Sequence, residues 1–295
     1  MTHADPPTIT DVERTEIERA NASRRPVVLF VHGLWLLSSS WDRWRSLFED
    51  AGYVTIAPSW PNDPPSIEAA RSNPDAFASK MVQEVTDHYL EAIAELSVKP
   101  AVIGHSFGGL IAQKIAGEGA SLATVAVDPA PFRGVLSVPL SSLKSSAPVV
   151  GHLASLKHGV TLSFEEFTYG WANALNEDEA RALYNEFHVA AAGNPIFEVV
   201  TANFNPFSQT RVDTKNPERG PLLLVAGEAD HTVPVKPTQQ SYEIQSKNHG
   251  VTEFVILPER GHSLTIDHGW HEVAETALEF IQRFSPATSD GAPAF

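Results

Sequence analysis

Short apolar runs alternate along the chain with stretches whose apolar residues recur at helical spacing. Six runs predict strands, at residues 26–31, 53–57, 99–103, 122–127, 221–226 and 252–257, and the runs at 26–31 and 99–103 have the pattern of buried parallel strands. Helical patterns lie between them, and the clearest is a long amphipathic segment from Phe77 to Ile93. Strands that alternate with helices favour a doubly wound, mostly parallel α/β sheet with helices on both faces. In such a sheet, ligands bind beyond the carboxyl ends of the strands.

The pattern changes between residues 131 and 209. Strand-like runs disappear, Ser and Pro cluster at residues 139–148, and helical segments follow around 165–171 and 177–189. We interpret 131–209 as a helical lid inserted into the α/β domain. The lid is rich in aromatic residues, most of which we expect to form its own core.

The remaining residues divide into a core and two tails. Residues 26–130 and 210–284 are expected to form the core. Residues 1–25 read as a polar tail, in which two alternating patterns indicate weak edge strands, at 8–10 and 15–18. Residues 285–295 have the composition of a disordered C-terminal tail.

Composition narrows the classes of partner. The formal net charge is −15, and no basic cluster extends beyond Arg24 and Arg25, so the charge disfavours nucleic acid and anionic membrane as partners. The chain has 0 Cys, which excludes disulfides and thiolate chemistry. No apolar run approaches the ~20 residues needed to span a bilayer, and the first residues lack the pattern of a secretory signal. We therefore expect a cytoplasmic protein, and a homo-oligomer is compatible with the sequence.

The sequence Gly104-His105-Ser106-Phe107-Gly108 carries the strongest chemical signal. A buried-strand pattern precedes it and a helical pattern follows it, so Ser106 is expected at the tip of a sharp strand-to-helix turn. The two glycines would let the strand and the helix pass close to each other. This arrangement presents a serine hydroxyl as a nucleophile.

Other polar residues follow the remaining predicted strands. His32-Gly33-Leu34-Trp35 follows the first, Asp128 the fourth, Asp230 the fifth and His262 the last. With the Ser106 turn, these motifs resemble the α/β-hydrolase superfamily over roughly residues 26–284. The resemblance implies the α/β-hydrolase fold and a Ser-His-Asp hydrolase without cofactor or metal.

Each residue then has an expected role. His262 would take the proton of Ser106, and Asp230 would orient the imidazole. Asp128 competes with Asp230 for the acid position, because some members of the superfamily carry the acid after the earlier strand; Asp230 matches the usual position. The backbone N–H groups of Phe107 and Leu34 would form the oxyanion hole.

Two histidines are expected to have structural roles. His32 is expected to brace the oxyanion loop, and His105 to pack beside the turn. The spacing of the other histidines does not predict a metal site.

The substrate is expected to be a small hydrophobic ester or lactone. Trp35 lies beside the oxyanion loop, and Trp171 and Phe167 are candidates to line the cleft. A serine at the nucleophile position excludes the alkyl-enzyme chemistry of dehalogenases and epoxide hydrolases, which use aspartate there.

Several other activities fit the same residues. Amide cleavage, lactonase activity and cofactor-free perhydrolase (haloperoxidase) activity use the same triad. A hydroxynitrile lyase would need a lid lysine, for which Lys144 and Lys157 are the nearest candidates. A ligand receptor with little turnover is an alternative of another class.

Overall fold

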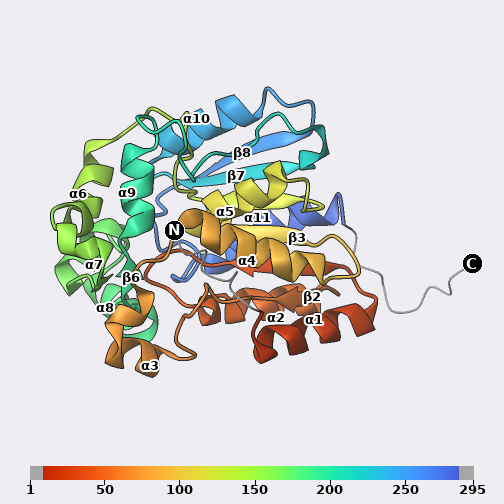
Figure 1. Cartoon of the computed structure of the whole chain (residues 1–295), viewed down its shortest axis with the longest axis horizontal. Helices are drawn as coiled ribbons and strands as arrows, with labels where there is room; N and C mark the ends of the chain where they lie inside the picture. Colours follow the sequence, from red (N-terminus) through yellow and green to blue (C-terminus); the bar gives the residue numbers. More distant parts are fainter. Residues whose placement is uncertain (1–8, 286–295) are drawn as a thin grey trace, which may run out of the picture.

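A computed structural model describes residues 9–285. Six parallel strands form one sheet in the order β2-β1-β3-β4-β7-β8 (Figure 1). The strand bounds are Val27–Val31 (β1), Val54–Ile56 (β2), Ala101–His105 (β3), Thr124–Val127 (β4), Leu222–Gly227 (β7) and Thr252–Leu257 (β8). The prediction of a mostly parallel α/β sheet is therefore confirmed.

Side chains alternate between two apolar cores, one on each face of the sheet. In β1, Leu29 and Val31 belong to the core on one face and Val28 and Phe30 to the core on the other. Residues of α1 (Asp11–Ser23), α4 (Val82–Ala94) and α5 (Phe107–Gly117) belong to the first core, and those of α2 (Asp42–Asp50) and α11 (Trp270–Gln282) to the second. An all-apolar strand is thus explained by burial on both faces.

The N-terminal region differs from the prediction. Residues 11–23 form helix α1 instead of a tail with edge strands. Thr10 caps the helix, since its hydroxyl accepts from the N–H of Glu13 while the Glu13 carboxylate accepts from the N–H of Thr10. Ile17 and Ala20 are the apolar residues that α1 buries. Because most of its other residues are exposed, the polar residues of the helix resemble those of a tail.

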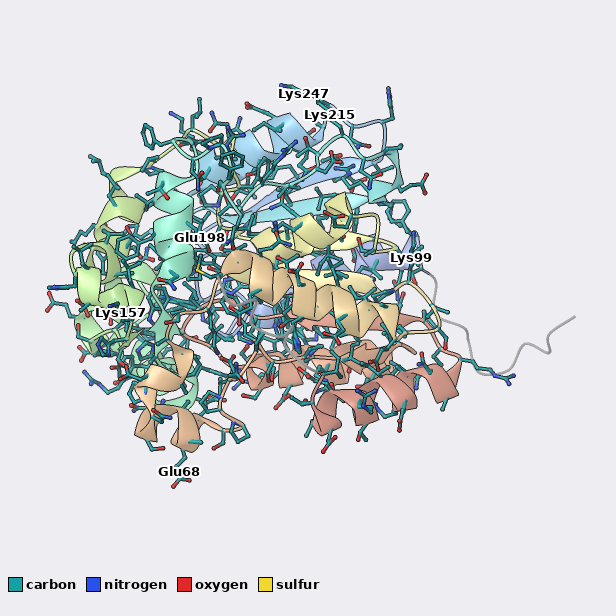
Figure 2. The ribbon with its side chains drawn as sticks, viewed as in Figure 1. Glu68, Lys99, Lys157, Glu198, Lys215 and Lys247 are labelled. Carbon is teal, nitrogen blue, oxygen red and sulfur yellow. The ribbon has the colours of Figure 1, made fainter. Side chains whose placement is uncertain are left out.

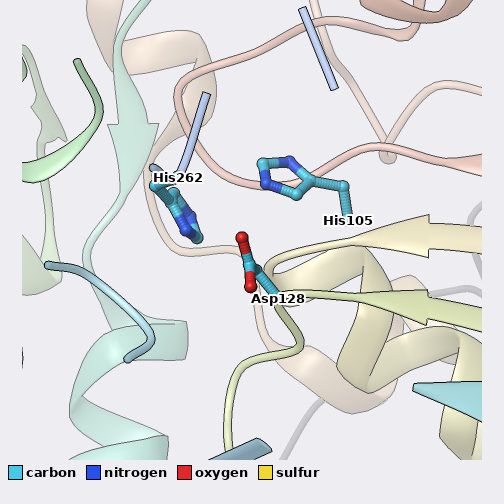
Figure 3. A group of neighbouring side chains, drawn as sticks. All are labelled: His105, Asp128 and His262. Atoms are coloured by element: carbon cyan, nitrogen blue, oxygen red, sulfur yellow. The ribbon is translucent and has the colours of Figure 1, made fainter. Parts of the chain in front are cut away.

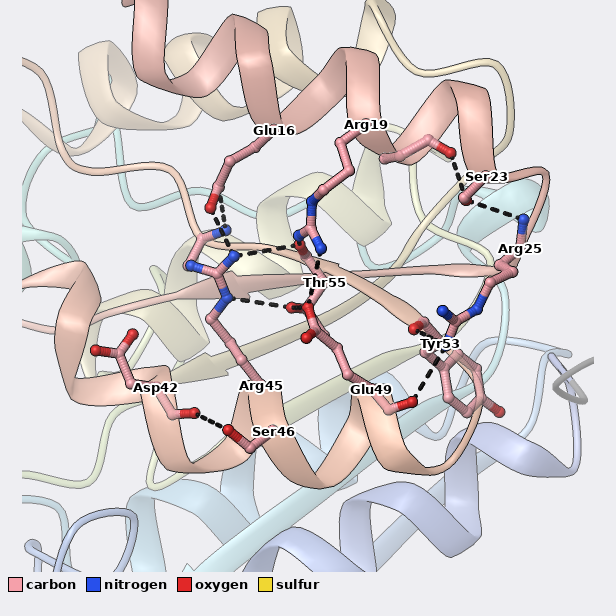
Figure 4. Close-up of polar contacts among 12 residues, drawn as sticks. Glu16, Arg19, Ser23, Arg25, Asp42, Arg45, Ser46, Glu49, Tyr53 and Thr55 are labelled. Carbon is pink, nitrogen blue, oxygen red and sulfur yellow. Dashed lines mark hydrogen bonds and ion pairs between the residues drawn. The ribbon is translucent and has the colours of Figure 1, made fainter.

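Ion pairs link α1 to α2 around the edge strand β2. The Arg45 guanidinium bonds the Glu16 carboxylate at 2.6 Å and the Thr55 hydroxyl at 3.1 Å (Figure 4). Arg19 bonds the Thr55 carbonyl at 2.6 Å and Glu49 at 3.3 Å (Figure 4). These contacts cover the exposed edge of the sheet with charged side chains, which disfavours pairing with a second sheet.

The segment between β4 and β7 gathers at one end of the sheet (Figure 1). Its helices are α6 (Leu140–Val150), α7 (Phe164–Gly170), α8 (Glu177–Phe187) and α9 (Asn194–Thr201). It also contains a short antiparallel pair, β5 (Gly159–Val160) with β6 (Ala191–Ala192), which the sequence pattern did not predict. We call residues 128–221 the inserted segment.

The remaining elements among residues 9–285 are α3 (Ile67–Ser72), α10 (Val235–Gln245) and four 3₁₀ turns. No helix among residues 9–285 is long and apolar enough to cross a membrane. Apart from Ser285, the predicted C-terminal tail lies outside the described residues, as do residues 1–8 of the predicted N-terminal tail.

Candidate active site

Ser106 occupies the sharp turn between β3 and α5. Its backbone has φ 56° and ψ −121°, a conformation that L-residues adopt only under strain. Gly104 and Gly108 permit the turn: a Cβ on Gly104 would lie 2.0 Å from the Gly108 carbonyl oxygen, and a Cβ on Gly108 would lie 2.0 Å from that of Val31. The strand and the helix therefore approach each other more closely than any residue with a side chain would allow.

His262 lies between Ser106 and Asp230. Its Nε2 is 3.0 Å from the Ser106 hydroxyl oxygen and its Nδ1 is 2.6 Å from Asp230 Oδ2. All three side chains are buried. A carboxylate only accepts hydrogen bonds, so Nδ1 carries the proton and the neutral ring leaves Nε2 free to accept from the serine hydroxyl.

Backbone groups fix the orientation of Asp230. It follows β7, and its Oδ1 accepts hydrogen bonds from the N–H groups of Thr232 at 2.6 Å and Val233 at 2.9 Å. The other oxygen is thereby turned toward His262. Of the two aspartates considered from the sequence, the structure places Asp230 on the imidazole.

Two rings hold the His262 imidazole in place. The Trp171 indole stands edge-on to it, with ring centroids 4.7 Å apart, and the His105 ring lies 4.8 Å away. Burial and the neighbouring His262 lower the pKa of His105 well below its ordinary range, so His105 is neutral.

Trp171 and Phe167, the candidates to line the substrate cleft, are both buried in this structure. Each is only 1% exposed, and neither is among the described residues around the cavity. Their rings stack at 6.0 Å within the core of the inserted segment, and Trp171 then packs on His262. Both residues belong to or follow α7, and the helix turns them toward the protein interior because an aromatic ring gains most by full burial.

A cavity of about 270 Å³ opens beside Ser106. Trp35 and Phe107 line it, and residues 130–132 and 135–139 together with side chains of α6 and α9 form its walls. None of the described residues that line it carries a charge. The cavity suits an apolar, uncharged ligand.

The two residues expected to supply the oxyanion hole, Phe107 and Leu34, each follow a residue of the serine turn or of the loop packed against it. Phe107 is the first residue of α5, so its N–H is one of the unpaired donors of a helix N-terminus. Leu34 follows Gly33, where a Cβ would lie 2.9 Å from Ser106 Cβ and 3.5 Å from its Oγ. The loop that carries the Leu34 amide therefore runs directly against the serine.

His32 braces this loop, as its sequence context indicated. Its Nδ1 lies 2.9 Å from the Gly33 carbonyl oxygen, and its Nε2 accepts from the Trp60 N–H at 3.3 Å. Behind it lies a buried ion pair between Asp63 and Lys80, with Asp63 Oδ2 at 3.3 Å from His32 Nε2. Sequence reasoning missed this pair because both residues lie in irregular segments without a motif.

Asp128 does not bond the imidazole but lies near it (Figure 3). One of its oxygens, Oδ1, accepts from the Gly227 N–H at 2.7 Å. Burial, followed by the charge of Asp230, raises the pKa of Asp128 well above its ordinary range. Candidate metal ligands of His105, Asp128 and His262 lie within 4.8 Å of one another. Both nitrogens of His262 are already engaged by Ser106 and Asp230, which leaves neither for an ion.

A parallel sheet in this order, with a serine on a strained strand-to-helix turn, is the architecture of α/β hydrolases. A comparison of the sequence with protein-family models leads to the same class. The chain belongs to the alpha/beta hydrolase family, whose model matches residues 28–276. A comparison with curated proteins found no match.

Solved structures of lipases and esterases share this fold. A monoacylglycerol lipase of Paleococcus ferrophilus has 22% identity and a TM-score of 0.63, over 88% of this chain and 95% of that one. An extracellular α/β-hydrolase from a Paenibacillus species has 18% identity and a TM-score of 0.61, over 88% and 99%. A thermophilic esterase from Thermogutta terrifontis has 16% identity and a TM-score of 0.58, over 88% and 90%. At these identities the likeness describes the fold.

Proposed function

We propose that this protein is a serine hydrolase that cleaves a hydrophobic carboxylic ester or lactone through an acyl-enzyme. One observation carries the proposal: His262 joins the Ser106 hydroxyl to the Asp230 carboxylate beside an uncharged cavity. The lipase and esterase structures that share the fold support the same class of reaction.

The reaction follows from the positions of the groups. His262 Nε2 takes the proton of Ser106 as Oγ attacks the carbonyl carbon, and Asp230 stabilises the imidazolium that forms. The N–H groups of Phe107 and Leu34 stabilise the oxyanion. When the tetrahedral intermediate collapses, the C–O bond breaks and His262 returns the proton to the leaving alcohol. Water then attacks the acyl carbon and gives one proton to His262; as the bond from the acyl carbon to Oγ breaks, His262 passes that proton to Oγ, which releases the acid and restores Ser106.

The cavity supports an apolar substrate. Its walls are mainly aliphatic and aromatic, and its rim includes the exposed side chains of Leu136 (68%) and Phe204 (90%). We propose that Trp35 contacts the substrate in the cavity, and that the inserted segment acts as a lid because α6 and α9 form much of the wall.

The two lysines considered for a hydroxynitrile lyase do not line the cavity. Neither Lys144 nor Lys157 is among the described residues that line the cavity. The Lys144 ammonium lies 3.8 Å above the centre of the Tyr169 ring. Lys157 lies on the outside of the inserted segment (Figure 2).

A panel of p-nitrophenyl esters and lactones, with neutral and charged acyl groups, tests the proposal. We expect turnover of neutral apolar substrates, loss of turnover in Ser106→Ala with an unchanged circular dichroism spectrum, and labelling of Ser106 by a fluorophosphonate. A Ser106→Ala variant that keeps its activity, or a preference for charged acyl groups, would contradict it.

A further inference from the structure

Two buried carboxyl groups lie side by side behind the imidazole. Asp128 comes from the end of β4 and Asp230 from the turn after β7, and their side chains interact directly. Asp128 Oδ1 accepts from the Gly227 N–H, but Oδ2 is buried and has no donor partner among the described residues. Two ionised carboxylates in this position would repel each other without water to screen them.

A single proton shared by the two carboxyl groups removes this repulsion. The hydrogen bonds to each carboxyl group indicate which of the two holds the proton. Asp230 accepts from three donors: the N–H groups of Thr232 and Val233 on Oδ1, and His262 Nδ1 on Oδ2. Asp128 accepts from one backbone donor only. Since each hydrogen bond from a donor favours the ionised form, the charge belongs on Asp230 and the proton on Asp128.

We propose that Asp128 is a neutral carboxylic acid whose O–H donates a hydrogen bond to the Asp230 carboxylate, which holds that carboxylate against His262. Asp128 is then a positioning residue that acts through Asp230. This inference rests on the proposed serine-hydrolase function only for its kinetic consequences. The protonation state itself is a property of the folded protein.

The groups around Asp128 favour the neutral form. Those that face it are Asp230, His262 from the loop after β8, and His105 from the end of β3. The pKa of His105 is lowered well below its ordinary range, so that ring offers no positive charge. His262 is already paired with Asp230. Burial accordingly raises the pKa of Asp128 well above the ordinary range of an aspartate, so that its neutral form is favoured.

The matched variants are Asp128→Asn and Asp128→Ala. An asparagine is nearly isosteric with the neutral acid, keeps a donor for Asp230, and tolerates the φ of 40° at this position. We expect Asp128→Asn to keep kcat within about threefold, and Asp128→Ala to lower kcat about tenfold or more with KM unchanged. Asp230→Asn, by contrast, should lower kcat by about 10³-fold or more. Asp128→Gly relieves the backbone and replaces the alanine variant if that variant does not fold.

Two readouts separate positioning from simple structural support. The fall of kcat/KM that ionisation of Asp128 causes as the pH rises should be absent in Asp128→Asn. The infrared difference spectrum between the wild type and Asp128→Asn at pH 7 should show the carbonyl band of a protonated carboxyl group, because the band of Glu198 is common to both proteins and cancels. The infrared test does not require activity, so it stands even if the proposed function fails. Loss of activity in Asp128→Asn equal to that in Asp128→Ala, or absence of the infrared band, would overturn the inference.

Discussion

The Trp171 indole stands edge-on against the His262 imidazole, with an interplanar angle of 80°. The backbone strengthens this contact, because the Trp171 carbonyl accepts a hydrogen bond from the Ser263 N–H at 3.1 Å. Trp171 therefore touches the imidazole and its loop while remaining outside the cavity. We infer that it limits the motion of the ring that would transfer the proton in the proposed reaction.

This position predicts a kinetic signature. Trp171→Phe should lower kcat about tenfold, because a smaller ring leaves His262 less constrained, and should leave KM unchanged. Steady-state kinetics on the preferred ester check it, with Trp35→Phe as a matched control that alters the cavity wall and is expected to raise KM. A rise of KM in Trp171→Phe at constant kcat would restore the substrate-binding interpretation.

The sequence predicted the sheet and the serine turn because both depend on local features. A strand buried on both faces must be apolar throughout, and the turn needs glycines at 104 and 108, where a Cβ would meet backbone at 2.0 Å. Motif resemblance then indicated Asp230 and His262, and the structure places His262 beside Ser106 and Asp230 on the far side of the imidazole.

The remaining features depend on packing between distant segments. Helix α1 buries a stripe too narrow to be distinguished from a polar tail. The orientation of Trp171 was not predictable, because helical spacing does not tell which neighbour an aromatic ring will meet. The Asp63–Lys80 pair joins two irregular segments, and no sequence pattern links such residues.

Glu198 makes stability depend on pH. It lies on α9 (Figure 2), and one carboxylate oxygen accepts from the Val82 N–H at 2.9 Å while the other is buried without a partner among the described residues. Burial raises the pKa of Glu198 to about 7, although Val82 and Lys114 act against the rise. The folded protein thus holds this proton more tightly than the unfolded chain.

Stability therefore decreases as the pH rises through the pKa of Glu198. The contribution of Glu198 to stability is full below its unfolded pKa near 4.5 and is lost as pH rises through about 7. The loss is on the order of 3 kcal/mol. Glu198→Gln cannot ionise, so denaturant unfolding at pH 5 and pH 8 should show a smaller fall for the variant than for the wild type. Equal pH dependence in the two proteins would count against this assignment.

The buried Asp63–Lys80 pair supports the loop that carries the Leu34 amide. Lys80→Met leaves the Asp63 charge without its cation, which should lower the free energy of unfolding by about 3–5 kcal/mol. The double variant Asp63→Leu with Lys80→Met removes both charges and should recover most of that loss. Denaturant melts of both singles and the double give the coupling energy.

An exposed ion pair provides the control for this comparison of single and double variants. Arg181 and Glu177 lie 2.7 Å apart on α8, with side chains 53% and 74% exposed. Their removal should change the free energy of unfolding by less than about 1 kcal/mol. A Lys80→Met variant as stable as the wild type would show that the buried pair contributes little to the support of the loop.

The cavity wall on α9 should select for the size of the substrate. Val199 lines the cavity, and a tryptophan there would occupy space that an acyl chain otherwise fills. Each methylene excluded from an apolar site loses about 0.8 kcal/mol of transfer free energy, or about fourfold in kcat/KM. Val199→Trp should therefore lower kcat/KM for p-nitrophenyl octanoate at least tenfold and for the acetate less than about threefold. Val12→Trp, at an exposed position of α1, is the control and should change neither value. An equal loss on both esters would place the acyl chain elsewhere than along α9.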